Sequence, residues 1–235
     1  MTDIKIIGTS HIAQVSIELA KKEIQEFKPD IVGVELDRGR YQSLITKEKS
    51  HLPLSAIFKI GFLGYVFAKF GSWGSRKLGK LVGVSPGDEM LAAIKEAKKV
   101  KAKIALVDQP IEITLARFSR QITWKEKWNF VVDIFRAMFF RKKVAKELGL
   151  TTTFDLSKVP SGKIIAGLMN IMKKRYPNVY KVLVFERNVY MIKNIVSLKV
   201  NYPNAKILVF VGAGHVQGMV ELIKNMRVKV GKSSK

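Results

Sequence analysis

Two copies of a Gly-x-x-His pattern, Gly8–His11 and Gly212–His215, lie at opposite ends of this 235-residue chain. Each copy follows a short apolar run, and a third apolar run between them ends in the carboxylate of Glu35. Two histidines and a carboxylate can hold zinc with an open position for water, or bind an iron- or manganese-type ion on one face. The sequence therefore predicts a divalent-metal site formed by His11, Glu35 and His215.

Other polar side chains are candidates for the same site. Asp108 ends a fourth apolar run, while Glu186 and Arg187 interrupt an apolar helical stretch. We expect Glu35 to be the third metal ligand or the general base that acts on a bound water. The side chains expected to orient a substrate or stabilise an oxyanion are Ser10, Arg40 and Arg187, with Asp108 and Glu186 as further catalytic candidates.

Structural roles are the alternatives for each of these residues. His11 could simply end a strand, Glu35 could pair with Arg38 or Arg40, and Asp108 could cap a turn before Pro110. Glu186 and Arg187 could form an ion pair inside a helix instead of facing the strand ends from a lid helix. A nucleophilic triad is not expected, because Ser10 cannot easily be activated by its own neighbour His11. The Gly-x-Ser-x-Gly stretch at 83–87 follows none of the predicted strands, whereas a nucleophile elbow requires a strand-to-helix turn.

The four apolar runs predict buried strands. Each run is short, rich in β-branched residues and shows little alternation, as in strands that are covered on both faces of a parallel sheet. Helical patterns separate the runs, which indicates an α/β fold. Because ligands bind outside the carboxyl ends of such strands, the polar residues should meet at one edge. The expected strands are Ile4–Ile7, Ile31–Val34, Ile104–Val107 and Ile207–Val211.

Helical patterns fill the segments between the predicted strands. Ser85 is predicted to be the N-cap of one, with Pro86 and Asp88 in its first turn and Lys98 and Lys99 near its end. The others are Ile12–Phe27, Arg38–Ile45, Lys163–Arg175 and Asn178–Leu198. Long separations between the strands predict one domain over 1–235: a small, largely parallel four-stranded core (about 1–45, 101–117 and 201–225) with two helical insertions (about 46–100 and 118–200).

The net charge of +23 is confined to the part of the chain after residue 50. Residues 1–50 contain 8 basic and 8 acidic side chains, whereas the remainder contains 34 basic and 11 acidic ones. Such an excess indicates an anionic partner or a lysine-rich solvated surface. Two aromatic segments with nearby basic residues, Leu54–Phe70 and Trp128–Phe140, favour an anionic membrane surface or a homodimer interface. No nucleic-acid-binding motif is present, so no specific nucleic-acid partner is expected.

Six segments resemble the TraB/PrgY family, and its archaeal members most closely. They are GTSHIAQVS (8–16), VELDRGRY (34–41), VSPGDEMLAAIKEA (84–97), LVDQPIEITLAR (106–117), ERNVYM (186–191) and VGAGHVQGM (211–219). The family's usual Asp-Arg-Pro is Asp-Gln-Pro here, with Gln109, and its Glu-Arg-Asp is Glu-Arg-Asn, with Asn188. The same superfamily includes the TIKI proteases and is linked more distantly to erythromycin esterase and the ChaN-like lipoproteins, which implies a fold of that type.

The resemblance implies a divalent-metal-dependent protease, since the TIKI histidines and glutamate correspond to His11, His215 and Glu35. The expected cofactor is manganese, cobalt or zinc, and the expected substrate a peptide or an unfolded polypeptide. The alternative is a non-catalytic, membrane-associated protein that sequesters a peptide, as implied for pheromone shutdown. The sequence shows no signal peptide and no transmembrane helix, so a cytoplasmic or membrane-associated location is expected. Archaeal relatives often have a hydrophobic region after this domain, and the chain ends without one.

Overall fold

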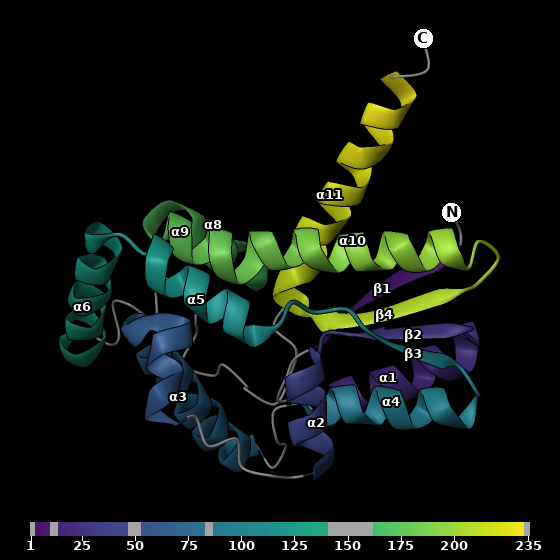
Figure 1. Ribbon diagram of the computed structural model, residues 1–235, viewed down its shortest axis with the longest axis horizontal. Coiled ribbons are helices and arrows are strands. Elements are labelled where there is room, and N and C mark those ends of the chain that lie inside the picture. Colours follow the sequence, from purple (N-terminus) through teal and green to yellow (C-terminus); the bar gives the residue numbers. More distant parts are fainter. Residues whose placement is uncertain (1–2, 10–13, 47–52, 83–86, 141–161, 233–235) are drawn as a thin grey trace.

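A computed structural model describes residues 3–9, 14–46, 53–82, 87–140 and 162–232 (Figure 1). Its centre is a parallel four-stranded sheet in the order β1-β4-β2-β3. The strands are β1 (Ile4–Thr9), β2 (Ile31–Val34), β3 (Lys103–Leu106) and β4 (Ile207–Gly212). All four predicted strands and the predicted fold class are thus confirmed. The last strand of the chain lies between the first two, and β1 and β3 form the edges.

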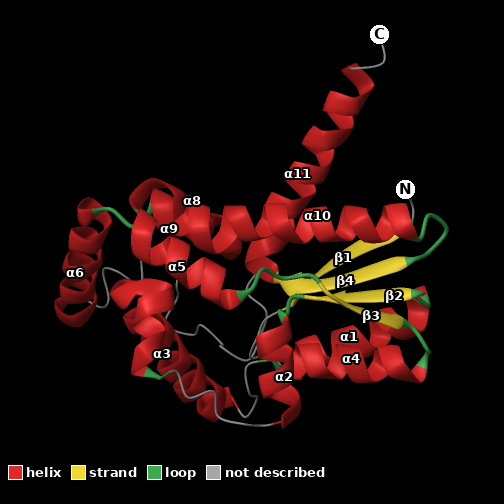
Figure 2. Cartoon of the chain, viewed as in Figure 1, coloured by secondary structure: helices red, strands yellow, loops and turns green. Residues whose placement is uncertain are grey.

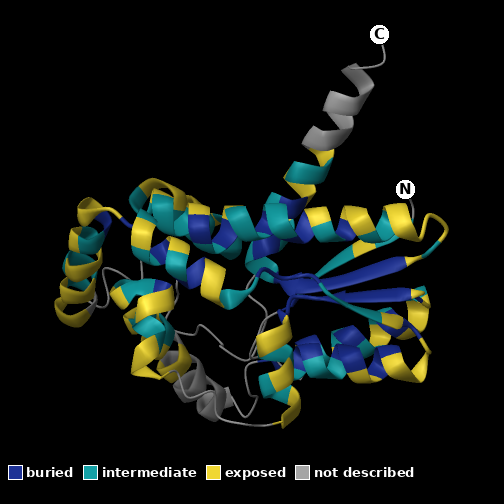
Figure 3. Cartoon of the chain, viewed as in Figure 1, coloured by how far each residue is buried: buried dark blue, intermediate teal, exposed yellow. Residues whose placement is uncertain are grey.

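Helices cover both faces of the sheet, as Figures 1 and 3 show. Helices α1 (Gln14–Phe27) and α4 (Asp88–Lys99) pack on one face, where they bury Leu208 and Phe210 of β4. Helices α10 (Glu186–Asn201) and α11 (Ala213–Lys232) lie on the other face, over Val209 and Val211. Because neighbouring residues of β4 point to opposite faces, double coverage requires an apolar residue at each position.

Further helices lie beyond the carboxyl edge of the sheet (Figure 2). Among them α3 packs closely against α5, and Gly64 lies at that contact: a Cβ there would fall 2.5 Å from the carbonyl oxygen of Leu115. The elements of this region are α2 (Arg38–Thr46), η1 (Leu54–Ala56), α3 (Ile57–Val82), α5 (Ile111–Gln121), α6 (Trp124–Phe139), α8 (Gly162–Arg175), α9 (Pro177–Tyr180) and the π-helical segment η2 (Lys181–Phe185).

Two helix predictions need correction. The helix expected at Ser85 begins at Asp88, after Gly87, whose positive φ of 98° suits a residue without a side chain. Ser85 and Pro86 themselves lie outside the described residues. The helix expected over Asn178–Leu198 consists of α9, η2 and α10, because a π-helical segment interrupts the α-helical hydrogen bonding.

The helices α4 and α10 fall within the predicted insertion ranges 46–100 and 118–200, yet both pack on the sheet. Each therefore belongs to the layered core and not to an insertion, because its apolar face covers the strands. In the described part of the chain, no helix is long and apolar enough to cross a membrane.

Candidate active site at the carboxyl edge of the sheet

Glu35, Asp108 and His215 come together from the ends of three different strands. Glu35 follows β2, Asp108 follows β3, and His215 lies in the first turn of α11 after β4. Glu35 Oε1 is 3.4 Å from His215 Nε2, and both residues are buried. The predicted convergence is therefore confirmed for Glu35 and His215. His11 and Ser10 lie outside the described residues, and their roles stay predictions.

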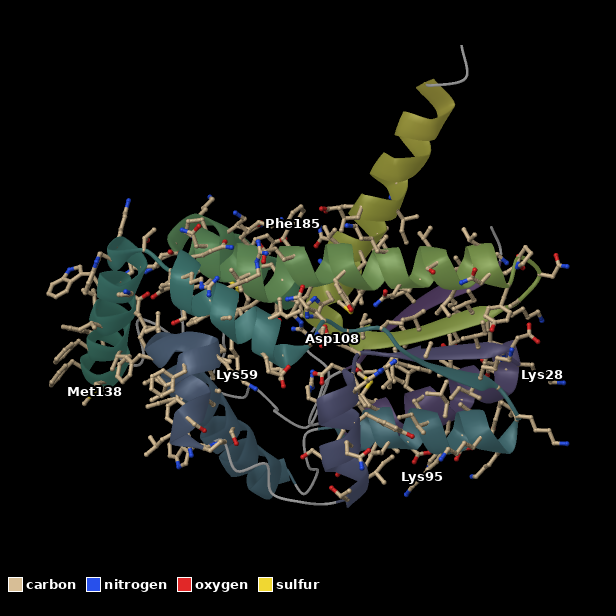
Figure 4. All side chains as sticks on the ribbon, in the orientation of Figure 1. Lys28, Lys59, Lys95, Asp108, Met138 and Phe185 are labelled. Atoms are coloured by element: carbon tan, nitrogen blue, oxygen red, sulfur yellow. The ribbon has the colours of Figure 1, made fainter. Side chains whose placement is uncertain are left out.

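Arg187 occupies the centre of this group. From the first turn of α10, its guanidinium Nη2 donates to Glu35 Oε1 at 2.5 Å. The same side chain also holds Asp108 by two hydrogen bonds, Nε to Oδ1 at 3.0 Å and Nη2 to Oδ2 at 2.7 Å. Asp108 itself is labelled in Figure 4. Such a planar fork matches a carboxylate in both distance and direction. Arg187, predicted to orient a substrate, is thus the internal counterion of two buried carboxylates.

The charges around Arg187 keep it fully ionised. Burial alone would lower the pKa of the guanidinium, but the negative charges of Glu35 and Asp108 outweigh that effect and raise the pKa above its ordinary value. The guanidinium in turn supplies both buried carboxylates with hydrogen-bond donors, which a buried charged group requires.

The contacts of His215 favour one tautomer of its neutral imidazole. Arg187 Nη1 lies 3.2 Å from His215 Nε2, and an arginine can only donate, so Nε2 carries a lone pair. The ring proton of the neutral imidazole is then on Nδ1, which donates to Asn188 Oδ1 at 2.6 Å. A Cβ on Gly218 would lie 2.4 Å from Asn188 Nδ2, so only glycine leaves room for this amide. Asn188 therefore fixes the orientation of His215.

The second carboxylate oxygen of Glu35 binds the backbone where the second Gly-x-x-His pattern begins. Gly212 N–H donates to Glu35 Oε2 at 2.5 Å. That contact crosses from β4 to the end of β2, and it exists because those two strands are neighbours in the sheet. Glu35 thus receives a main-chain donor on one oxygen and Arg187 on the other.

The remaining candidates are not all brought to this point. Arg40 reaches Asp108, with Nη1 at 3.3 Å from Oδ2, and its side chain is 36% exposed at the rim of the site. Glu186 instead pairs with Arg117 of α5, with Nε at 2.7 Å from Oε2, so the structure does not bring it to Glu35. Of the alternatives, the pairing of Glu35 with Arg38 or Arg40 is wrong, since its partner is Arg187.

Sequence reasoning missed Asn188, because the position differs from the family pattern. Its available signal was its place beside Arg187, as a polar residue in an otherwise apolar helical stretch. Gln109, the other departure, donates from Nε2 to Thr114 Oγ1 at 3.0 Å and so stabilises the start of α5. The structure gives it a local role next to Asp108.

One distance, between Glu35 and His215, is compatible with two ligands of a single ion. Two ligands of a tetrahedral ion, each about 2.0–2.2 Å from it, are about 3.3–3.6 Å apart, and the two atoms here are 3.4 Å apart. The lone pair on His215 Nε2 and the Asn188 contact on Nδ1 match the usual support of a ligating imidazole. Within the described ranges, no group of three or more ligating side chains is arranged to hold one metal ion, and Arg187 already contacts both donor atoms.

Comparisons with known proteins give a consistent picture. The sequence model of the TraB/PrgY/gumN family matches residues 66–230. An uncharacterized protein of Methanocaldococcus jannaschii is 36% identical over 95% of this chain and 54% of its own length. The TraB domain-containing protein of Homo sapiens is 26% identical over 91% of this chain and 61% of its own length. The chain thus spans little more than half the length of these relatives.

Proposed function

The chain belongs to the TraB/PrgY/gumN family, and from that premise we propose that it is a divalent-metal-dependent hydrolase of peptides. The observation that carries this proposal is the buried Glu35–His215 pair, set at the carboxyl edge of a parallel sheet at the spacing of two ligands of one ion. A peptide is proposed as the substrate because of the resemblance to the TIKI proteases.

In this proposal Glu35, His215 and His11 hold manganese, cobalt or zinc. A divalent ion at that point would polarise a scissile carbonyl and lower the pKa of a bound water. Binding there requires Arg187 to leave Glu35 and His215, while its two hydrogen bonds to Asp108 can persist. Asn188 keeps the lone pair of His215 directed at the site.

Other side chains of the site are assigned proton transfer and substrate binding. Glu35 is the third ligand or the general base, and its buried position beside Gly212 N–H keeps it oriented in either role. Arg40 is assigned the binding of the developing oxyanion or of the substrate, a role supported by its partly exposed position beside Asp108. Ser10 is assigned the same task from its sequence position.

Chelation tests this function directly. We expect the full chain, supplied with Mn²⁺, Co²⁺ or Zn²⁺, to cleave members of a mixed library of unstructured peptides. Removing the ion with a chelator should abolish the cleavage, and adding it back should restore it, because the attacking water depends on the ion. Cleavage is read by mass spectrometry of the products. Turnover that persists after full removal of metal would exclude this mechanism.

The exposed apolar side chains of helix α6 support a second proposed function, which is peripheral binding to an anionic membrane surface. Among the described residues, its polar face makes the hydrogen bonds to other elements: Asp133 accepts from Arg175 Nη2 at 2.6 Å and from Tyr176 Oη at 2.6 Å. Glu126 accepts from the Asn178 backbone at 2.7 Å. Burial and the hydrogen bond to Asp133 raise the pKa of Tyr176 to about 12, so the phenol stays protonated as a donor.

The apolar face of α6 is consequently turned to solvent, where Trp124 is 82% exposed. Lys125 and Lys127 lie along the same helix, and the Lys127 ammonium is 4.2 Å from the centre of the Trp124 ring. Aromatic side chains beside lysines suit the interface of an anionic bilayer. The net charge of +23 disfavours the alternative pairing of two copies by like-charge repulsion. The exposed residues at helical spacing are Trp124, Trp128, Val131, Phe135 and Met138.

Sedimentation with liposomes measures this binding. We expect the chain to sediment with anionic liposomes at low salt, and Trp128→Glu to weaken binding at least tenfold, since burying one large aromatic side chain is worth about 2 kcal/mol. Val200→Glu is the matched control, because Val200 is 72% exposed on α10, against 69% for Trp128. Equal binding to neutral and anionic liposomes, or none to either, would remove the membrane function and leave homodimerisation as the use of this face.

A further inference from the structure

We propose that β3 binds an extended peptide as an added strand and so guides it to the Glu35–His215 site. The inference rests on the proposed function for its choice of substrate and names how that substrate is held. β3 pairs with β2 alone among the described strands, which leaves its other side as an edge of the sheet (Figure 1). Its carboxyl end leads directly to Asp108.

At this edge, the main chain of β3 presents groups that pair with no other described strand. Lys103 N–H donates to Asp30 and Val107 N–H donates to Val34, both on the β2 side. Because amide directions alternate along a strand, the N–H and C=O groups of Ile104 and Leu106 point away from β2. A second extended chain can pair with these groups, as peptides do at other exposed sheet edges.

A groove follows the same edge. Its volume is about 760 Å³, and it is walled on one side by Tyr190, Asn194, Ser197 and Leu198 of α10. These residues recur at helical spacing, so one face of α10 forms the wall. The floor is the stretch Ile104–Asp108, which at about 3.3 Å per residue accommodates an extended segment of about five residues.

An acceptor lies at the end of the groove nearest the site. Asp37 lines the groove and is only 5% exposed, and among the described residues its Oδ2 has no hydrogen-bond partner. Its other oxygen, Oδ1, accepts from Arg40 N–H at 3.0 Å. A buried carboxylate oxygen without a donor is costly. A peptide N–H or amino group would supply that donor, which a bare hydrocarbon ligand would not.

Three features therefore favour one occupant. The edge offers regularly spaced main-chain groups, the groove has the length of a short strand, and Asp37 requires a donor. An extended polypeptide segment meets all three requirements, and its alternate side chains would contact α10 and the helices on the other face. The groove is continuous with the candidate site through Asp108, which lines the one and belongs to the other.

Binding of a peptide array to the full-length Glu35→Gln variant, without metal, tests the inference apart from any hydrolysis. Ile104→Pro removes the outward N–H but leaves the hydrogen bonds to β2. The affinity for those twelve-residue peptides of the array that the parent binds should fall at least fivefold. Ile6→Pro is the matched control. Asp3 C=O accepts from Ile207 N–H, so Ile6 N–H points outward from the opposite edge, and both isoleucines are partly buried. We expect the control to bind as the parent does.

Amide exchange gives a second measurement that does not depend on a variant folding. Adding a recognised peptide should slow exchange of the Ile104 and Leu106 amides and leave Ile6 unchanged. Binding without such protection, or equal weakening by both proline variants, would overturn the inference. So would protection of Ile104 that rises with protein concentration alone, because a second copy would then occupy the edge. If Ile104→Pro did not change hydrolysis by the metal-loaded protein, the β3 inference would be overturned and the proposed function would stand. If peptides bound at β3 but the metal-loaded protein did not hydrolyse them, only the proposed function would be removed.

Discussion

Arg187→Met should lower the free energy of unfolding by about 3–5 kcal/mol, the usual cost of leaving buried charges without their partner. The side chains of Glu35 and Asp108 are each 2% exposed, and both depend on this guanidinium. Methionine has a similar length but no donor and no charge. Urea unfolding at neutral pH measures the change directly.

The control for this variant is Arg117→Met. Arg117 also pairs with a carboxylate, that of Glu186, but its side chain is 49% exposed. Exposed pairs contribute about 0–1 kcal/mol, so little change is expected. Divalent metal should restore part of the stability lost in Arg187→Met, since a cation at Glu35 and His215 replaces the missing charge. If the two variants were equally stable, Arg187 would not be the counterion on which this site depends.

Glu35→Gln should reduce peptide hydrolysis at least about a thousandfold while the protein still folds, since it removes both the charge and the base required at the ion. Some stability should also be lost, about 1–3 kcal/mol. In the parent, the two carboxylate oxygens of Glu35 accept from Gly212 N–H and from Arg187. In the variant, the amide NH₂ group replaces one of these oxygens, so a donor faces a donor at that position.

Initial rates with the cleaved peptides, and calorimetry with the metal, would measure the two effects of Glu35→Gln separately. Glu221→Gln makes the same chemical change on the exposed surface of α11 and should leave turnover as it is. His11→Ala should lose metal binding as well as turnover. Unchanged turnover in Glu35→Gln would assign the activity to another site or to a contaminating enzyme.

Local patterns in the sequence were sufficient to predict the strands and one edge of the site. Val209 and Val211 face one layer of helices, and Leu208 and Phe210 face the other. Because both faces of β4 are covered, the strand is an uninterrupted apolar run, which is visible in the sequence alone. In the same way, a polar residue directly after a parallel strand must lie at the carboxyl edge. That reasoning brought Glu35 and His215 together correctly.

Tertiary structure alone decided what surrounds this pair. Arg187 reaches Glu35 across 152 positions of sequence, and Gly212 reaches it only because β4 lies between β1 and β2. No local sequence pattern predicts that strand order. No local pattern predicts either that Asn188 contacts His215 or that Glu186 pairs with Arg117. The physical reason is that burial and periodicity are properties of a short segment. The choice of partner for a buried charge depends instead on which segments the packed layers bring within hydrogen-bond distance.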